Sequence, residues 1–306
     1  MKSKSGKQGF TIIELLTVMS IIVILMSIMM PSLAAIRRYS KVLKQKGQFH
    51  DIGTGLEMFS IDFDGYPDSK GTRTADGSPA WNVDTDTPAK PYCGAMRLCE
   101  AMLGQDGFGF HPDSRFAARG TDSTGTIFYY PRPLTTANDN RKDRKHPYID
   151  ADKFKKAYVD DLFPDPGVYT GSDPCESVIC DVFGKVKGIE TNNKLGMPIL
   201  YYNANTAKLG NDPNIINISG NIYDWRDNHD ITGLRPVGVA ATEVIPLYEG
   251  VTAPTAKTYA EVFYDIIRDK KATAISKPYN DSTYILMSAG WDELYGTKDD
   301  IYNFGE

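Results

Sequence analysis

One carboxylate interrupts the longest apolar run of the sequence. Glu14 lies within residues 10–30, which are otherwise apolar apart from a few small hydroxyl side chains. A carboxylate near the centre of a membrane-spanning helix costs about 2.5–3.5 kcal/mol, and such residues usually have a partner and a function. Glu14 therefore either reaches to the membrane interface or pairs with a cation at the same depth. Cleavage of the chain after Gly9 would create such a cation, the new amine of Phe10, on a neighbouring copy shifted along the helix axis.

The apolar run is long enough to cross a membrane. As a helix its 21 residues would span about 31 Å, and the bilayer core is about 30 Å thick. The preceding residues, MKSKSGKQG, contain three lysines and no acid, which predicts a cytoplasmic N-terminus and export of everything after Pro31. An ordinary secretory signal has a small-x-small cleavage site after its apolar run. Here the small residue, Gly9, precedes the run, so cleavage there would leave the apolar helix on the mature protein.

These residues have the order of a known processing site. The segment GFTIIELL at residues 9–16 resembles the prepilin peptidase site of type IV pilins and type II secretion pseudopilins. The resemblance implies that the peptidase cuts after Gly9 and methylates the amine of Phe10, and that Glu14 neutralises a neighbour's amine during assembly. Pro31 matches a proline that is frequent in the family. Its ring removes the hydrogen bond to the carbonyl of Ser27, so we expect the helix to kink or loosen there.

The helix is expected to continue well beyond the membrane. Apolar residues recur at roughly helical spacing as far as Phe59, between positions occupied by lysines and arginines. We predict one helix from about 10 to 60, with residues 10–30 as the transmembrane and filament-core part. Residues 31–61 would be the amphipathic part, packed on a head formed by residues 62–306. Three glycines, Gly47, Gly53 and Gly55, weaken this part and predict a bend.

The head is predicted to mix short helices and strands. Its patterns indicate helices at residues 95–103, 151–159 and 259–268, and strands at residues 178–182, 198–203 and 283–288. This order predicts an α+β fold in which the long helix packs on a small antiparallel sheet in a loop-rich head. Residues 70–197 match no small pseudopilin, and we interpret them as a large insertion.

An acidic turn precedes the C-terminus. Four acids lie within nine residues around a glycine: Asp292, Glu293, Asp299 and Asp300. Calcium takes six to eight oxygen ligands, which carboxylates and loop carbonyls supply readily. The closing segment, residues 282–304, resembles the last strand and calcium loop of major pseudopilins.

The resemblance implies a structural Ca²⁺ held by Asp292, Asp299 and Asp300, with loop carbonyls completing the shell. This chain has Glu293 and Leu294 where a glycine commonly follows the first aspartate. The alternative is an acidic surface turn without an ion.

Four cysteines form two close pairs in the sequence, Cys93 with Cys99 and Cys175 with Cys180. Neither spacing is the C-x2-C of a zinc site, so we expect disulfides if the head is exported to an oxidising compartment. All three pairings remain open, and free cysteines packed in the core are the alternative.

Composition argues against some other functions. The net charge of −5 and pI near 5.5 are unlike a nucleic-acid-binding protein. A membrane-anchored periplasmic enzyme would have to use the four histidines, His50, His111, His146 and His229, with Asp113 and Asp230 nearby. No nucleophile elbow, zinc-protease motif or phosphate loop accompanies them. A third hypothesis is a binding module, for which the 18 tyrosines could supply contact surface.

The resemblance implies a non-enzymatic structural subunit of the pseudopilus of a type II secretion system. Such a subunit crosses the inner membrane once, with its N-terminus in the cytoplasm and its head in the periplasm, and its filament lies in the periplasm or at the cell surface. The implied partners are further copies in a helical homopolymer, the prepilin peptidase, the inner-membrane assembly platform, minor pseudopilins, and membrane lipid before assembly. A type IV pilus subunit shares the whole N-terminal argument, and the sequence does not separate the two.

Overall fold

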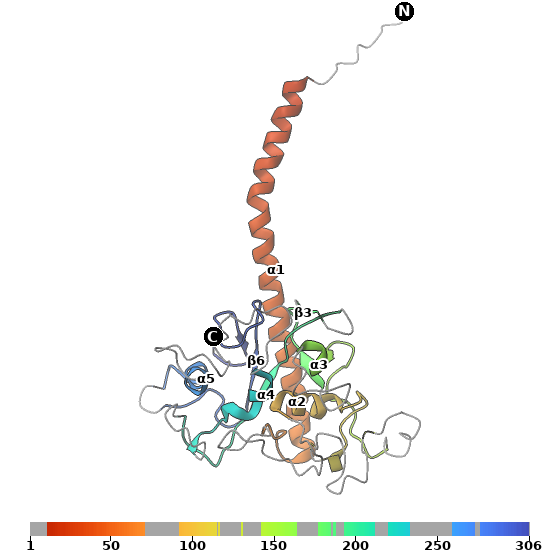
Figure 1. The fold of residues 1–306 in the computed structure, drawn as a ribbon, viewed down its shortest axis with the longest axis vertical. Coiled ribbons are helices and arrows are strands. Elements are labelled where there is room, and N and C mark those ends of the chain that lie inside the picture. The colour runs from red at the N-terminus through yellow and green to blue at the C-terminus, as the bar shows by residue number, and fades with distance from the viewer. Residues whose placement is uncertain are drawn as a thin grey trace, which may run out of the picture. The chain divides into compact units, whose positions relative to one another are not determined.

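The structure is a computed structural model, shown in Figure 1. It describes residues 11–70, 92–114, 116, 130, 142–163, 177–184, 186–187, 193–211, 220–232, 259–272 and 276–305. The chain divides into two compact units, an N-terminal unit of residues 1–43 and a head unit of residues 44–306. Helix α1 (Ile12–Phe63) contributes to both. It confirms the long helix predicted from the sequence.

In the N-terminal unit, α1 has no covering from the described part of its own chain. Every residue from 11 to 40 is exposed, including Ile12, which is 85% exposed, and Tyr39, which is 65% exposed. By length and composition α1 is able to cross a membrane. The helix continues through Pro31, so this proline does not end it.

In the head unit, one face of α1 is buried by both apolar and amide side chains. Ile52, Leu56 and Phe59 are buried at the apolar positions of this face. Gln45 and Gln48 precede them and bind a second element, strand β2 (Ser177–Cys180) and the residues that follow it. Gln48 Nε2 donates to the Cys180 carbonyl at 2.9 Å, and the Val182 N–H donates to Gln45 Oε1 at 3.0 Å.

The glycines of α1 permit close packing. A Cβ at Gly55 would lie 2.9 Å from both Ile149 Cγ2 and Met102 Sδ, and one at Gly53 would lie 3.0 Å from the Tyr284 hydroxyl. At Gly47 nothing lies within 4 Å. Two of the three glycines that weaken the helix in isolation are therefore explained by close approach to the head.

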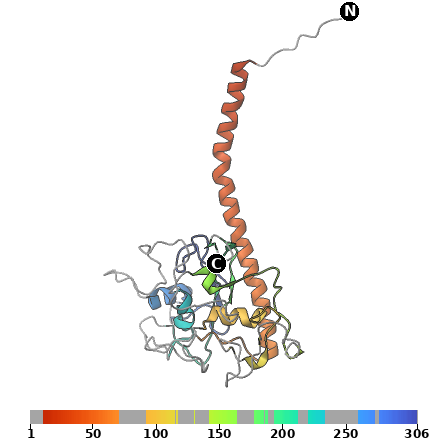
Figure 2. The same cartoon turned by 45° about the vertical axis from the view of Figure 1, so that its right-hand side comes forward.

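Helix α2 (Gly94–Leu103) lies at the centre of the head unit. All ten of its residues are buried, although they lie in the range 70–197 that we interpreted from the sequence as an insertion. Figures 1 and 2 show α2 beside the final turns of α1, where Met102 meets Gly55. Its N-terminus is held by Asn228, whose Oδ1 accepts from the Ala95 N–H at 2.7 Å. The predicted helix at 95–103 is confirmed, and it is part of the main core.

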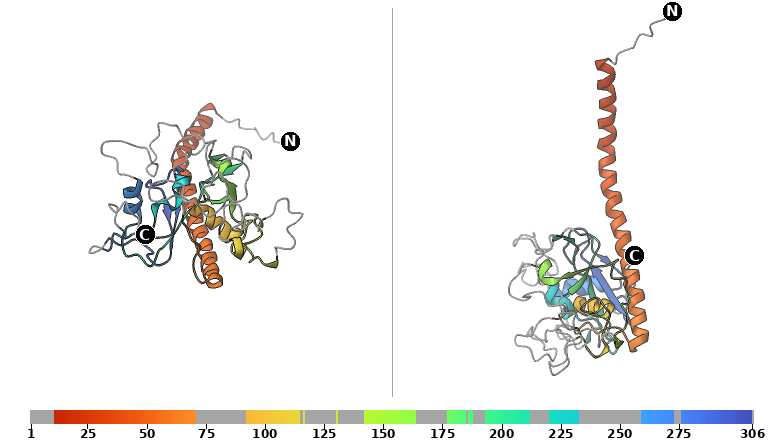
Figure 3. Two further views of the ribbon diagram at one scale, coloured as in Figure 1. Left: turned by 60° about the horizontal axis from the view of Figure 1, so that its bottom comes forward. Right: turned by 90° about the vertical axis from the view of Figure 1, so that its right-hand side faces the viewer.

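The strands of the head unit pair antiparallel throughout the described residues. They are β1 (Lys155–Tyr158) with β2; β3 (Val186–Lys187) with β4 (Lys194–Leu195); and β5 (Leu200–Asn203), β6 (Tyr284–Ser288) and β7 (Ile301–Tyr302) in the order β5-β6-β7. The first and third sheets are linked, because the Ile199 N–H donates to the Ile179 carbonyl and the Asp181 N–H donates to the Met197 carbonyl, both at 2.8 Å. Figure 3 shows β6 beside the head-unit part of α1.

Short helices complete the described head unit. They are η1 (Pro112–Ser114), α3 (Val159–Leu162), η6 (Trp225–Asn228), α4 (His229–Thr232) and α5 (Tyr259–Ile267). The predicted strands near residues 178–182, 198–203 and 283–288 correspond to β2, β5 and β6, and the predicted helix at 259–268 corresponds to α5. These results confirm the α+β class.

The predicted helix at residues 151–159 is wrong. The chain forms a turn followed by β1, which pairs with β2 in the register Lys155↔Cys180 to Tyr158↔Ser177. Only residues 159–162 are helical. Lysine and alanine favour a helix locally, but Ala157 is buried against the core and the partner strand satisfies the backbone. Tertiary pairing therefore overrides local propensity here.

Candidate functional site

The N-terminal end of α1 is closed by a reciprocal pair of side chains. The Thr11 N–H and the Thr11 hydroxyl both donate to Glu14 Oε2, at 2.9 and 2.7 Å. The Glu14 N–H donates to Thr11 Oγ1 at 3.3 Å. A threonine and a glutamate three residues apart that satisfy each other's N–H groups form a capping box, which starts a helix and typically contributes about 1 kcal/mol.

This arrangement gives Glu14 a partner within its own chain. From the sequence we expected Glu14 to reach the membrane interface or to pair with a neighbour's amine, and Thr11 was not identified as its partner. The pattern T-x-x-E ahead of an apolar run is the signal that would have found it. Gly9 and Phe10, the predicted cleavage and methylation residues, lie outside the described residues.

The acidic turn between β6 and β7 is a tightly hydrogen-bonded loop. It opens at Gly290, where two features favour glycine. Its φ of 70° lies in the left-handed region, and a Cβ there would clash with the Asp299 carbonyl oxygen. Asp299 Oδ2 accepts from the N–H groups of Trp291 and Asp292, at 2.7 and 3.0 Å. Thr297 Oγ1 donates to Asp299 Oδ1 at 2.9 Å. Asp299 thus ties the two ends of the loop together.

Asp300 is directed at the loop backbone. Its Oδ2 accepts from the Gly296 N–H at 2.7 Å and from the Tyr302 hydroxyl at 3.0 Å, and its Oδ1 accepts from the Thr297 N–H at 3.3 Å. Burial raises the pKa of Asp300 to about 7, against these hydrogen bonds. This carboxyl group holds the turn together in the conformation described.

Asp292 and Asp299 are the acids of the loop that lie against each other. Burial and the neighbouring Asp299 raise the pKa of Asp292. Burial also acts to raise the pKa of Asp299, but hydrogen bonds from Thr297, Asp292 and Trp291 outweigh it and the pKa is lowered. The described residues contain no group of three or more His, Cys, Asp or Glu side chains placed to hold a metal ion. The loop therefore provides two adjacent carboxyl groups, and Asp300 would have to turn to complete the predicted ligand set.

Glu293 occupies the position where sequence comparison suggested a glycine. Its φ is 67°, in the left-handed region that non-glycine residues rarely adopt, and its side chain is buried. The turn is therefore kept at the cost of backbone strain. Asp181, a second buried acid whose charge interacts with Glu293, accepts from the Ser288 hydroxyl at 2.8 Å and from the Phe183 N–H at 3.1 Å.

Three of the four cysteines are described, and all three are buried. No disulfide joins Cys93, Cys99 and Cys180 to one another, and Cys175 lies outside the described residues. Burial raises the pKa of the Cys99 and Cys180 thiols, which disfavours the reactive thiolate. The disulfides stay a prediction.

The four histidines lie in separate parts of the head unit. His50 is exposed on α1, and His146 is exposed in a segment without regular secondary structure. His111 is buried with Nδ1 accepting from the Asp113 backbone N–H at 3.2 Å, and burial lowers its pKa. His229 is buried edge-on to the Trp225 ring. The side chain of Asp230 is not among those described. The His–Asp combination at 111 and 113, which the enzyme hypothesis would have to use, is a contact between the imidazole and the Asp113 backbone rather than its carboxylate.

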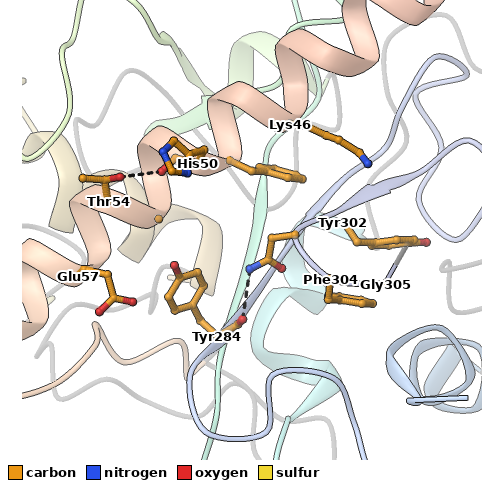
Figure 4. Close-up of a pocket in the computed structure, with 11 residues that line it drawn as sticks. Lys46, His50, Thr54, Glu57, Tyr284, Tyr302, Phe304 and Gly305 are labelled. Carbon is orange, nitrogen blue, oxygen red and sulfur yellow. Dashed lines mark hydrogen bonds between the residues drawn. The ribbon is translucent and has the colours of Figure 1, made fainter. Parts of the chain in front are cut away.

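A groove of about 500 Å³ lies between α1 and the C-terminal strands (Figure 4). His50, Thr54 and Glu57 project from α1 on one side, and Tyr284 and Tyr302 line the other. The rings of Tyr302 and Phe304 stack at 5.0 Å, and Tyr279 stacks on Phe304 at the same distance. The groove has both aromatic and charged walls, which is the feature most relevant to the binding-module hypothesis.

Comparison with known proteins supports the N-terminal assignment. Residues 4–30 match the family model described as the prokaryotic N-terminal methylation motif. No curated protein and no solved structure matches the chain. The match covers the leader from Lys4 onward, the predicted cleavage residues, Glu14 and the apolar part of α1. The chain therefore carries an N-terminal methylation motif typical of type IV pilin-like proteins, which implies processing by a prepilin peptidase and anchoring in the membrane by one helix before assembly.

Proposed function

We propose that the protein is a structural subunit of a filament, the periplasmic pseudopilus of a type II secretion system. The observation that carries the proposal is the methylation motif at residues 4–30, which is followed directly by an apolar helix without cover in its own described chain. Soluble proteins rarely leave large contiguous apolar surfaces exposed unless these contact a membrane or a partner. The helix meets lipid before assembly and other copies of itself afterwards.

Assembly follows from the chemistry of the stem. Helices leaving lipid for a bundle of like helices exchange one apolar surrounding for another, so packing and polar contacts drive association. Glu14 Oε2 already accepts two hydrogen bonds from Thr11. The amine of a neighbour's Phe10 adds a charged donor to this carboxylate, and charge-assisted hydrogen bonds are roughly twice as strong as neutral ones. The inner-membrane assembly platform and minor pseudopilins would extract the subunit and add it to the polymer.

A secretion pseudopilus is favoured over a type IV pilus by the acidic loop. Its resemblance to the calcium loop of major pseudopilins is the specific observation, and the adjacent carboxyl groups of Asp292 and Asp299 are consistent with a cation there. We include in the proposal a structural Ca²⁺ at Asp292, Asp299 and Asp300. A type IV pilus subunit is the second candidate, because it shares the N-terminal argument.

Processing is tested by mass spectrometry of membrane-extracted protein from cells that possess the peptidase. We expect an N-terminal methylated Phe10 and loss of the three leader lysines, which lowers the formal net charge of −5 by three units. A Gly9→Leu variant, with a bulky residue at the cleavage position, should keep the leader. Intact Met1 in wild-type protein would contradict the proposal.

The system is tested by imaging and by secretion. Sheared and periplasmic fractions examined by electron microscopy should contain filaments, and deletion of the gene should trap secreted enzymes in the periplasm. Surface pili with normal secretion would favour the type IV pilus. Activity of a soluble fragment beginning at Tyr39, with no filaments in any fraction, would favour the enzyme hypothesis.

A further inference from the structure

The charged residues of α1 separate into two blocks of opposite sign. The basic block is Arg37, Arg38, Lys41, Lys44 and Lys46, and the sequence contains no acid between Glu14 and Asp51. The acidic block is Asp51, Glu57, Asp62 and Asp64, and no lysine or arginine lies between Lys46 and Lys70. All four acids are exposed, as are four of the five basic residues, Lys41 being half-buried. A mixed surface would interleave the two signs, so this separation needs an explanation.

The two blocks share a spacing. Lys44 and Asp62 are 18 residues apart, and so are Lys46 and Asp64. Eighteen residues make five turns of an α-helix, or about 27 Å of rise, so Lys44 and Asp62 lie on the same face of α1. Asp64 follows the helix end directly.

We propose that the basic block of one copy packs against the acidic block of a second, parallel copy shifted along the helix axis by about five turns. This copy is a different neighbour from the one whose Phe10 amine meets Glu14, because residues 10 and 14 are only about 6 Å apart along a helix. The proposal rests on the filament role proposed above, because parallel copies packed through α1 bring the two blocks side by side. Copies in register would face like charges, which repel. The pattern therefore selects an axial shift, in the way that charge pairs set the register of coiled coils.

Two acids of the acidic block, Asp62 and Glu57, have hydrogen-bond partners in the single subunit. Tyr148 donates to Asp62 Oδ2 at 2.7 Å, and Lys145 Nζ lies 3.4 Å from Asp62 Oδ1. The hydrogen bond from Tyr148 lowers the pKa of Asp62, so this acid remains ionised at neutral pH. Glu57 accepts from the Tyr66 hydroxyl at 2.7 Å. These contacts orient both carboxylates and leave them exposed to a further cation.

Lipid phosphate is the competing partner for the basic block. Cations just beyond an apolar span can bind anionic head groups. A lipid surface would account for the basic block alone, and it would leave the acidic block and the repeated 18-residue spacing unexplained. A second copy of the chain accounts for all three.

The test is a charge swap in the full-length protein, expressed in cells that possess the peptidase. Lys44→Asp and Asp62→Lys are made singly and together, and filaments are quantified in sheared fractions. Each single change places like charges together and should lower filament yield about three- to tenfold, whereas the double variant should recover to within about twofold of wild type. The differences should shrink between about 0.1 and 1 M salt, because the screening length falls from about 10 to 3 Å.

Two controls keep the result interpretable. Asp62→Asn keeps an acceptor for Tyr148 and removes the charge, so it should show a reduced yield with an unchanged melting temperature of the head. Lys270→Glu reverses an exposed charge beyond α5 and should leave filament yield unchanged. If wild type forms filaments and both single variants give the wild-type yield, the register proposal alone is overturned. Absence of filaments in wild type would overturn the proposed function. If Lys44→Asp is lost from the membrane fraction while Asp62→Lys keeps wild-type membrane retention and filament yield, the basic block binds lipid instead. That result would overturn the pairing of the two blocks.

Discussion

The two parts of α1 follow different physical rules although they belong to one helix. In the N-terminal unit the helix exposes isoleucine, leucine and methionine in every direction, and its threonine and serine side chains hydrogen-bond within about one turn of the same helix, as Thr11 does with Glu14. In the head unit the same helix has one buried face, which includes the amide side chains of Gln45 and Gln48. The first part depends on surroundings supplied by lipid or other copies, and the second part depends on its own chain.

The comparison shows where polar groups can be placed. In the head unit Gln45 Oε1 and Gln48 Nε2 each find a backbone partner next to β2, which compensates part of the cost of burying these amides. Gln45 Nε2 and Gln48 Oε1 have no hydrogen-bond partner among the described residues. In the N-terminal unit a polar group such as Glu14 must be satisfied within one turn or by another molecule. A substitution in the first part should therefore affect assembly and leave the head folded, whereas one in the second part should affect folding.

The largest expected effect is on assembly. Glu14→Ala removes both the capping box and the partner of a buried amine, and leaving such a charge unpaired typically costs about 3–5 kcal/mol. We expect loss of filaments in sheared fractions, with an unchanged melting temperature of the head. If the head melts earlier in this variant, the two parts of α1 are not independent.

Glu14→Gln separates the two roles of this residue. Glutamine also serves at the third position of a capping box, so the helix start is preserved and only the charge is lost. Assembly by Glu14→Gln at the wild-type level would show that the cap suffices and that no amine pairing is needed.

The second effect concerns the head alone. Burial raises the pKa of Asp181 to about 7, helped by the nearby Glu293, from an ordinary value of 3.8. The folded protein thus binds this proton more tightly than the unfolded chain. This proton contributes about 2–4 kcal/mol to the free energy of unfolding. The contribution is present below about pH 4 and is lost as the pH rises through about 7.

Asp181→Asn should flatten this pH dependence, because the amide does not titrate. Its Oδ1 replaces the acceptor of the Phe183 N–H, and its Nδ2 donates to the Ser288 hydroxyl, which then acts as the acceptor. The measurement is urea unfolding between pH 4 and 8 in the presence of chelator, so that a bound cation does not contribute. Asp300, whose pKa is also about 7, contributes slope in the same window, so the curve of the variant is flatter than that of wild type but not flat. Parallel curves for variant and wild type would contradict the assignment.

The calcium proposal predicts a smaller, ligand-dependent effect. A single bound ion at about 100 times its dissociation constant stabilises the folded state by about 2.7 kcal/mol. The melting temperature of wild type should therefore be higher with calcium than with chelator. Asp299→Ala should lower stability in both conditions, because Asp299 closes the loop, and should abolish the difference between them. The absence of any calcium-dependent difference in wild type would leave an acidic turn held by hydrogen bonds.

The smallest expected effect compares two glycines of α1. Gly55→Ala places a methyl group 2.9 Å from Ile149 and Met102 and should destabilise the head by about 1–3 kcal/mol, less any gain in helix propensity. Gly47→Ala meets nothing within 4 Å and should raise stability by about 0.5–1 kcal/mol. Equal effects at both positions, measured by thermal unfolding, would show that Gly55 is not held by close packing.

Local pattern predicted much of the fold. The long helix, α2, α5 and the strands β2, β5 and β6 follow from runs of apolar residues with helical or strand character. The helix expected at residues 151–159 failed because β1 is stabilised by its partner β2, which is separated from it in the sequence. The strands β3, β4 and β7 are two residues long and too short to carry a pattern.

The sequence by itself determined the membrane helix, the processing motif and the position of Glu14, because these depend on residue order over a few turns. Only the tertiary structure decided that Gln45 and Gln48 bind the end of β2, that α2 is central to the core, and that Asp300 braces a turn. These contacts join residues far apart in the chain or depend on a loop conformation that side chains and backbone set together. The physical reason is that burial and hydrogen-bond satisfaction are decided by partners in space, which local sequence does not specify.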